Sequence, residues 1–389
     1  MKVSAKTIIV ATLAALLGIA SALMLNNMDR VVTNKTTVMP ISINLNQQIS
    51  LRKTFDIYLK LTVIRNGQVV DVREDYKDPI LKNFYVFVYN YFLGGRAAGR
   101  TMRYVDTSGT ARTYVDTEYG TANPHYIGVA IGNGTTPVSP TDYKLASWYA
   151  SSLSPYEMFG DNSTHGWINY TAEFYIDTNI NISEAGLFLY SVDAYQFGGE
   201  TSVSVYITRD IIYPSVQLQV DDYLIVTYVV YIKKSGNFVE NFYILLHNYI
   251  FRNETYPMLS YNDTSGASYY YVDTEHGGYN PKAHIQLGNG TATYKFATYN
   301  LSSPIGMKPA NIRYEDNTPD NITVYISALF SFNEDYNISE IGLVLELDAD
   351  KTATANLVDV LILYMPLATP ISVTAGQQLV FMITITLTY

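Results

Sequence analysis

The sequence predicts an all-β protein of two tandem, duplicated β-sandwich domains, each with one short helix. Its composition favours strands, because Tyr supplies 36 of 389 residues and aromatic and branched side chains pack well on a pleated surface. Hydrophobic residues make up 48% of the chain and charged residues 15%, which is too apolar for disorder. Short motifs recur in the same order about 157 residues later, which indicates an internal duplication.

The N-terminus has the pattern of an export signal. Lys2 and Lys6 flank the start of an apolar run over residues 7–20, and a small-x-small cleavage pattern ends at Ala22. We therefore predict a signal peptide over residues 1–22 and an extracellular, cell-surface location. The alternative is an uncleaved anchor, because the run from Thr7 to Leu25 is nearly long enough to span a bilayer. Membrane contact is expected only through this segment.

Charge and cysteine content exclude several classes of protein. The net charge is −10, and Lys and Arg do not cluster beyond the first residues, so we expect no nucleic-acid partner. The chain has no Cys, which excludes disulfides, thiolate metal sites and Cys nucleophiles. Core burial, assembly or bound ions would have to stabilise such an exported protein.

Sequons for N-linked glycosylation are more frequent than chance predicts. Eleven lie beyond the signal, where about five would be expected. We predict a glycoprotein that carries N-linked glycans; the alternative is that Asn and Thr are simply abundant in turns. The sequons are at Asn34, Asn133, Asn162, Asn169, Asn181, Asn253, Asn262, Asn289, Asn300, Asn321 and Asn337.

The repeated motifs define two copies of one unit. We predict an N-terminal extension over residues 23–50, domain 1 over residues 51–220 and domain 2 over residues 221–389. The matched segments are Asn83-Phe84-Tyr85 and Asn241-Phe242-Tyr243, Asn90-Tyr91 and Asn248-Tyr249, Asp106–Gly109 and Asp263–Gly266, Tyr114–Glu118 and Tyr271–Glu275, Asn123-Pro124 and Asn280-Pro281, Gly132–Thr135 and Gly288–Thr291, Tyr143-Lys144 and Tyr294-Lys295, and Asn181–Glu184 and Asn337–Glu340.

Each unit is expected to begin with a strand, followed by a helix and then by further strands. In the first copy, Asp78 is the predicted N-cap, Pro79 the first helical residue and Gly94-Gly95 the helix end; residues 237–251 form the second helix. The predicted strands are Phe55–Ile64, Tyr126–Ile131, Ile168–Asp177, Ala185–Val192, Thr201–Ile207, Tyr223–Ile232 and Leu379–Leu387. The strand at residues 223–232 matches both an opening and a closing strand, so it ends domain 1, begins domain 2 or bridges both.

Two repeated acidic pairs are candidate calcium ligands. Asp116 and Glu118, matched by Asp273 and Glu275, alternate on a strand, so each pair would share one face. The alternative is a solvated strand end. Asp273, Glu275 and His276 could form a transition-metal cluster with His284. The first copy has Tyr119 in place of His276, so we assign no metal site to this cluster.

The other repeated motifs favour structural roles over catalysis. Gly132–Thr135 lacks the Lys of a phosphate-binding loop, so a tight turn with positive φ is expected. Glu184 and Glu340 would need a partner carboxylate and a cleft to act as catalytic acids. Their place at a turn in both copies favours hydrogen bonds to loop N–H groups. A third interpretation is an isopeptide bond that uses Lys144 or Lys295. We expect no enzyme and no cofactor.

The repeat unit resembles a β-sandwich module of phage and virus-like tail proteins. The first copy carries that motif as Gly132–Thr136, Pro137–Asp142, Leu145 and Ile182–Phe188. The second copy lacks the Pro-x-Ser-x-Thr-Asp segment and has Val344 in place of the final Phe. In layout, the whole chain resembles subunits of archaeal surface threads and bundling pili. That resemblance implies a β-sandwich subunit joined to its neighbour by an N-terminal donor strand.

A candidate donor strand precedes the first unit. Residues 38–46 alternate apolar and polar side chains, and Ile41, Ile43 and Leu45 would share one face. Their burial would contribute roughly 5–8 kcal/mol before ordering costs. The segment could instead pair within its own chain as an edge strand.

Together, these features predict a subunit of an extracellular filament whose partners are copies of itself. The alternative is a non-filamentous surface or virion glycoprotein, such as an adhesin, an S-layer component or a spike. A glycan hydrolase is the third hypothesis.

Overall fold

The computed structural model describes most of the chain from residue 41 onward. Its strands belong to one compact unit, residues 41–389. The described residues are 41–50 (backbone only), 55–78, 80–90, 93, 102–112, 126–153, 155–162, 164–196, 199–234, 237–248, 259–270, 282–291, 293, 295, 297–317, 321–349 and 356–388. The predicted signal peptide lies outside them.

Residues 55–233, termed the first half, form two main antiparallel sheets and one small hairpin. The strands are Phe55–Arg65 (β2), Gln68–Asp78 (β3), Tyr104–Val105 (β4), Ala111–Arg112 (β5), Tyr126–Gly132 (β6), Trp148–Ser152 (β7), Tyr156–Asp161 (β8), His165–Tyr175 (β9), Ile180–Gln196 (β10), Gly199–Leu218 (β11) and Tyr223–Lys233 (β12). One sheet has the order β3-β2-β12-β9-β8 and the other β11-β10-β6-β7, while β4 pairs with β5.

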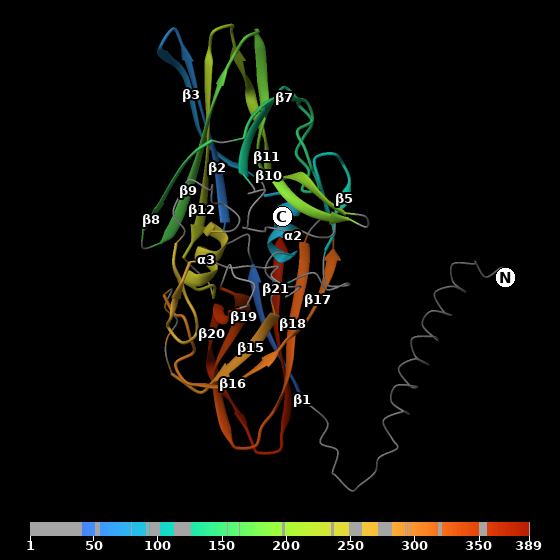
Figure 1. Ribbon diagram of the computed structural model, residues 1–389, viewed down its shortest axis with the longest axis vertical. Coiled ribbons are helices and arrows are strands. Elements are labelled where there is room, and N and C mark those ends of the chain that lie inside the picture. The colour runs from blue at the N-terminus through green and yellow to red at the C-terminus, as the bar shows by residue number, and fades with distance from the viewer. Residues whose placement is uncertain are drawn as a thin grey trace, which may run out of the picture. The chain divides into compact units, whose positions relative to one another are not determined.

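Residues 237–388, termed the second half, contribute two further main sheets. The strands are Tyr261–Asn262 (β13), Ser268–Tyr269 (β14), Lys282–Gly288 (β15), Pro304–Pro309 (β16), Asn311–Asn317 (β17), Asn321–Ser331 (β18), Tyr336–Asp348 (β19), Leu357–Val373 (β20) and Gln378–Thr388 (β21). One sheet is β16-β15-β19-β20. The other is β1-β21-β18-β17, in which Ile41–Ser50 (β1) comes from the N-terminal extension. Figure 1 shows β1, in blue, among the orange and red strands of this half.

The prediction of an all-β fold is confirmed. Side chains alternate along the strands between the core and the surface, as in β12, where Leu224, Val226 and Tyr228 are each 0% exposed. They pack in one continuous core with residues of the facing sheet, such as Ile127 and Val129 of β6. Each large apolar side chain buried in this way contributes about 1.5–3 kcal/mol.

Two short helices fill the centre of the molecule: Lys82–Tyr89 (α2) and Glu240–Leu246 (α3). The predicted start of α2 is wrong. Asp78 ends β3 instead, and Leu81 is the N-cap residue, with extended backbone and no side-chain cap. The reason is a turn with positive φ at Asn66 and Gly67, which pairs residues 68–78 with β2 as a hairpin. The predicted helix end at Gly94-Gly95 lies outside the described residues.

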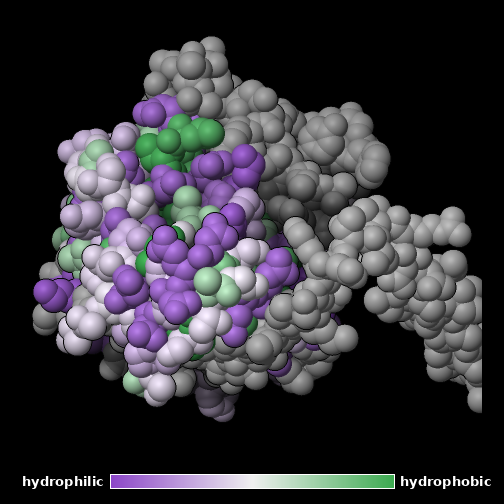
Figure 2. Space-filling model, turned by 90° about the horizontal axis from the view of Figure 1, so that it is seen from below, coloured by the Kyte–Doolittle hydropathy of each residue, from purple (hydrophilic) through white to green (hydrophobic). Residues whose placement is uncertain are grey.

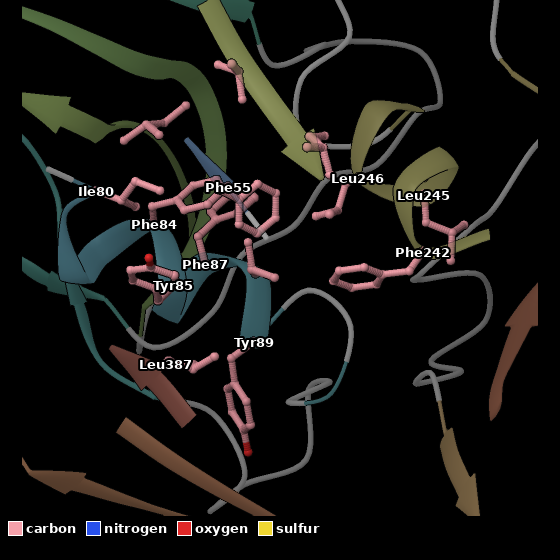
Figure 3. Close-up of a cluster of buried hydrophobic side chains, with 14 of the residues drawn as sticks. Phe55, Ile80, Phe84, Tyr85, Phe87, Tyr89, Phe242, Leu245, Leu246 and Leu387 are labelled. Atoms are coloured by element: carbon pink, nitrogen blue, oxygen red, sulfur yellow. The ribbon is translucent and has the colours of Figure 1, made fainter. Parts of the chain in front are cut away.

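Each helix also contacts the other half. The ring of Tyr89, at the end of α2, lies 5.7 Å from the ring of Tyr314 in β17, and Figure 3 shows Tyr89 and Leu387 at the same side of α2. In the opposite direction, the ring of His247 after α3 lies 5.1 Å from Phe159 of β8. The two halves therefore share one core across these helices.

The strand with an ambiguous assignment closes the first half. β12 lies between β2 and β9 and is antiparallel to both. A domain boundary at residues 220 and 221 would separate β12 from its two partners, so the halves divide after Lys233.

The described surface has scattered exposed apolar side chains. Seen from below, it is mainly hydrophilic, with hydrophobic residues gathered in a small patch (Figure 2). Large apolar side chains that are exposed are spread over several strands, among them Val69, Trp148, Tyr156 and Leu329. Small exposed groups of this kind are ordinary on soluble surfaces.

Candidate functional site

The strongest candidate for a functional site is the sheet edge formed by β21. There β1 pairs in parallel with β21: Ile41 is in register with Leu379 and Ile43 with Phe381. Both partners are buried core residues. The register shifts between Asn44 and Gln48, and pairing resumes to Ser50. The strand thus extends four residues beyond the predicted end at residue 46.

The predicted donor residues occupy unequal places in this strand. Ile41 and Ile43 have register partners that face the core, whereas Leu45 falls in the irregular stretch and has none. The segment pairs within its own chain, which is the alternative that the sequence left open.

The corresponding edge in the first half is completed differently. β2 lies beside β12 in antiparallel pairing and belongs to the same half. Among its described residues, the second half has no strand in this position. The segment that precedes α3 is β12, which already pairs with β2 and β9. A parallel strand cannot arrive through a tight hairpin and must come from a distant segment. The extension before residue 51 therefore supplies the strand that the second half lacks.

The buried carboxylate of Glu184 holds the loop after β6. Its Oε1 accepts hydrogen bonds from the N–H groups of Gly134 at 2.9 Å and Ser147 at 2.6 Å. Its Oε2 accepts from the N–H of Ala146 at 2.9 Å and from Nε of Arg209 at 3.0 Å. The predicted hydrogen bonds to loop N–H groups are present, and they use both oxygens of this carboxylate.

Glu340 has the same place in the second half, with weaker partners. It accepts from the N–H groups of Gly290 at 3.2 Å and Ser303 at 3.3 Å, and from the hydroxyl of Ser302 at 2.6 Å. Burial raises the pKa of Glu340, but hydrogen bonds from Ser302, Tyr364 and the loop N–H groups outweigh it and hold the pKa below its ordinary value.

The side chain that contacts the glutamate from the neighbouring strand, β11 or β20, differs between the halves. Nη1 of Arg209 donates to Asp142 at 2.5 Å and Nη2 to the carbonyl of Thr136 at 2.8 Å. At the corresponding register position of β20, Tyr364 donates its hydroxyl to Glu340 at 2.8 Å. The segment with Asp142 has no match in the second half. The second half therefore has neither charged member of this network: Tyr364 stands in place of Arg209, and no carboxylate corresponds to Asp142.

The glycines of this loop are needed for space and not for positive φ, so that expectation was wrong. A Cβ at Gly134 would lie 2.3 Å from Oε1 of Glu184, and a Cβ at Gly290 would lie 2.5 Å from Oε2 of Glu340. The described glycines with positive φ are Gly67, Gly109, Gly266 and Gly376. Close approach of the carboxylate thus excludes a side chain at both loop positions.

Four matched Asn residues have a role that sequence reasoning missed. In each case, Nδ2 donates to the carbonyl and Oδ1 accepts the N–H of one backbone residue, at 2.7 to 3.1 Å. The pairs are Asn83 with Val105, Asn90 with Met102, Asn241 with Asn262 and Asn248 with Leu259. The amides thus bind the helix region to the following hairpin as a neighbouring strand would. Their recurrence in both copies was the available signal.

The sequons divide by exposure. Those at exposed residues are Asn133, Asn162, Asn181, Asn289 and Asn337. The half-buried ones are Asn169, Asn262, Asn300 and Asn321. Among the latter, Nδ2 of Asn300, the atom to which a glycan would attach, donates to the carbonyl of Thr264 at 2.8 Å. Asn34 and Asn253 lie outside the described residues.

The remaining predicted site residues are the calcium candidates and the two repeated lysines. The calcium candidates Asp116, Glu118, Asp273 and Glu275 lie outside the described residues. Lys144 and Lys295 are both exposed, whereas an isopeptide bond needs a Lys enclosed beside a carboxyl group. Their exposure does not favour the isopeptide interpretation.

No protein-family model, curated protein or solved structure matches the chain. The resemblance to archaeal filament subunits and to phage tail modules stays a prediction that rests on motifs and layout. Among the helices in the part of the chain that the structure describes, none has the length and apolarity to cross a membrane.

Proposed function

We propose that this chain is a structural subunit of an extracellular, cell-surface filament, assembled by exchange of β1 between neighbouring copies. One observation carries the proposal: β1 completes a sheet whose other strands all come from residues 311–388. A strand from outside the second half fills this edge, so the same strand of another copy can fill it with the same backbone hydrogen bonds.

Exchange of β1 would build a fibre. Each subunit would give its β1 to one neighbour and receive a strand from another, so the contact is heterologous and does not close on itself. The bonds within one chain and between chains are the same, and local concentration and geometry would decide which set forms. β1 joins β2 through only residues 51–54, which limits how far a donated strand can reach.

The proposal includes an internal duplication into two β-sandwich domains with no catalytic role. The matching hydrogen bonds of Glu184 and Glu340 support the duplication, because unrelated segments would not place two buried carboxylates against the same loop. They support a structural role too, since each carboxylate is committed to holding its loop.

The second candidate function is a non-filamentous surface or virion glycoprotein in which β1 stays in its own chain. The intrachain pairing of β1 with β21 favours it. The two functions differ in whether removal of β1 abolishes polymerisation.

A chain without residues 41–50 is expected to fold but not to form filaments, because the sheets of the first half do not include β1. A synthetic peptide of residues 41–50 should bind this chain in a 1:1 complex. The peptide with Ile41→Asp and Ile43→Asp should not bind, since their register partners are buried. The matched control with Ser42→Asp and Asn44→Asp should bind. Electron microscopy and calorimetry measure both outcomes, and filaments formed without β1 would reject the proposal.

Native material is expected to begin at Leu23 and to carry glycans mainly on the five exposed sequons. Attachment at Asn300 should be absent or rare, because this residue is half-buried and its Nδ2 donates to the backbone carbonyl of Thr264. Intact mass and peptide mapping measure both. An unmodified mass from residue 1 to 389 would contradict export and glycosylation together.

A further inference from the structure

Three side chains that can bind a metal ion meet on the sheet of β15, β19 and β20, away from the β21 edge. They are His284, Glu346 and Asp359, and one ligand atom of each lies within 4.8 Å of the others. The strand register explains the meeting: Glu346 is directly opposite Asp359 on one side and Lys282 on the other. His284 is two residues from Lys282 on β15, so it projects from the same face.

The buried imidazole of His284 is an independent sign of a ligand. The residue is only 7% exposed, and its Nδ1 has no hydrogen-bond partner among the described atoms. A buried polar atom without a partner costs about 1–3 kcal/mol and calls for an explanation such as an unobserved ion. Burial also lowers the pKa of His284, which favours the neutral form of the ring, the form that binds metals.

The carboxylates of Glu346 and Asp359 are close enough to repel each other when both are charged, and a bound cation would reduce that repulsion. Burial raises the pKa of Glu346, and the charge of Asp359 raises it further. Burial likewise raises the pKa of Asp359. Lys282 pairs with Glu346: its Nζ lies 3.1 Å from Oε1, and its side chain is 55% exposed. Lys282 can therefore swing into solvent when a cation binds.

We propose that His284, Glu346 and Asp359 bind one divalent transition-metal ion of the Zn²⁺ class, with water completing the shell. An imidazole nitrogen with two carboxylate oxygens suits Zn²⁺, whereas Ca²⁺ takes oxygen ligands alone. Tetrahedral ligands about 2.0–2.2 Å from Zn²⁺ lie roughly 3.4 Å apart, so small side-chain rotations suffice. The ion would cross-link three strands, as a disulfide might in a chain that had Cys.

The site belongs to the second half alone. In the first half, Gly128 stands at the register position of His284, opposite Phe188, as His284 stands opposite Val344. Sequence reasoning considered His284 as a metal ligand but with other partners, because Glu346 lies 62 residues from His284 along the chain and Asp359 lies 13 further on. The inference is independent of the proposed assembly, since β1 makes no part of this sheet.

Calorimetry of Zn²⁺ binding to the full, tag-free, EDTA-treated chain tests the proposal. We expect one ion per chain and a higher thermal midpoint. His284→Ala and the near-isosteric Asp359→Asn should each lower the affinity at least about tenfold. His165→Ala, at a half-buried residue, and Glu173→Gln, at an exposed one, both lie outside the cluster and should not. Co²⁺ absorption gives a second readout of nitrogen and oxygen ligation. Binding unchanged in both cluster variants, or no binding by the native chain, overturns the proposal; circular dichroism verifies that each variant is folded.

Discussion

Glu184→Ala is expected to destabilise the first half by about 3–5 kcal/mol, because it removes the fully buried one of the two carboxylates that pair with the buried guanidinium of Arg209. The variant also leaves three loop N–H groups without an acceptor. Both Trp residues, Trp148 and Trp167, lie in the first half, so their fluorescence during urea unfolding reports on this region. The exposed Glu173→Ala is the control and should change stability by less than about 0.5 kcal/mol.

Glu340→Ala is expected to cost less, about 1–3 kcal/mol, because its partners are neutral. Circular dichroism is the appropriate measure, since the second half has no Trp. The pKa of Glu340 is lower when folded than the ordinary 4.5. Its stabilisation is therefore complete above that pH and is lost as the pH falls below it. Equal and small costs for the two Ala variants would contradict the roles assigned to the two carboxylates.

Regular alternation predicted several strands closely, because burial on one face imposes a period of two. The predicted span Leu379–Leu387 differs from β21 by one residue at each end, and Tyr223–Ile232 differs from β12 only at its last residue. Asp78 and Pro79 illustrate the limit. Their chemistry suits a helix start, yet the turn at residues 66 and 67 decides where they lie.

Contacts between distant residues could not be predicted. Arg209 is 25 residues from Glu184 and 67 from Asp142, and nothing in its neighbouring sequence indicates either partner. The same holds for β1, whose alternation predicted a strand but not its partner. That partner depends on β12 being occupied by β2, which is a property of the whole fold.

Exchange of β1 is best tested with engineered cysteines, because the native chain has none. Ser42 is in register with Val380. Neighbouring strands lie about 4.8 Å apart, within the Cα separation that a disulfide accepts. In the double variant Ser42→Cys and Val380→Cys, a bond within one chain gives a covalent monomer, whereas a bond between neighbours gives a ladder of covalent multimers.

The most direct measurement uses a mixture of two chains, one with Ser42→Cys alone and the other with Val380→Cys alone, oxidised after filaments have formed. A disulfide between the two variants requires β1 of one chain to lie beside β21 of another. Strand exchange predicts abundant covalent heterodimers from filaments, identified by mass spectrometry of the linked peptides, and few from monomers kept dilute. Filaments that yield no heterodimer, while the double variant in the same filaments gives only covalent monomers, would show that β1 stays in its own chain.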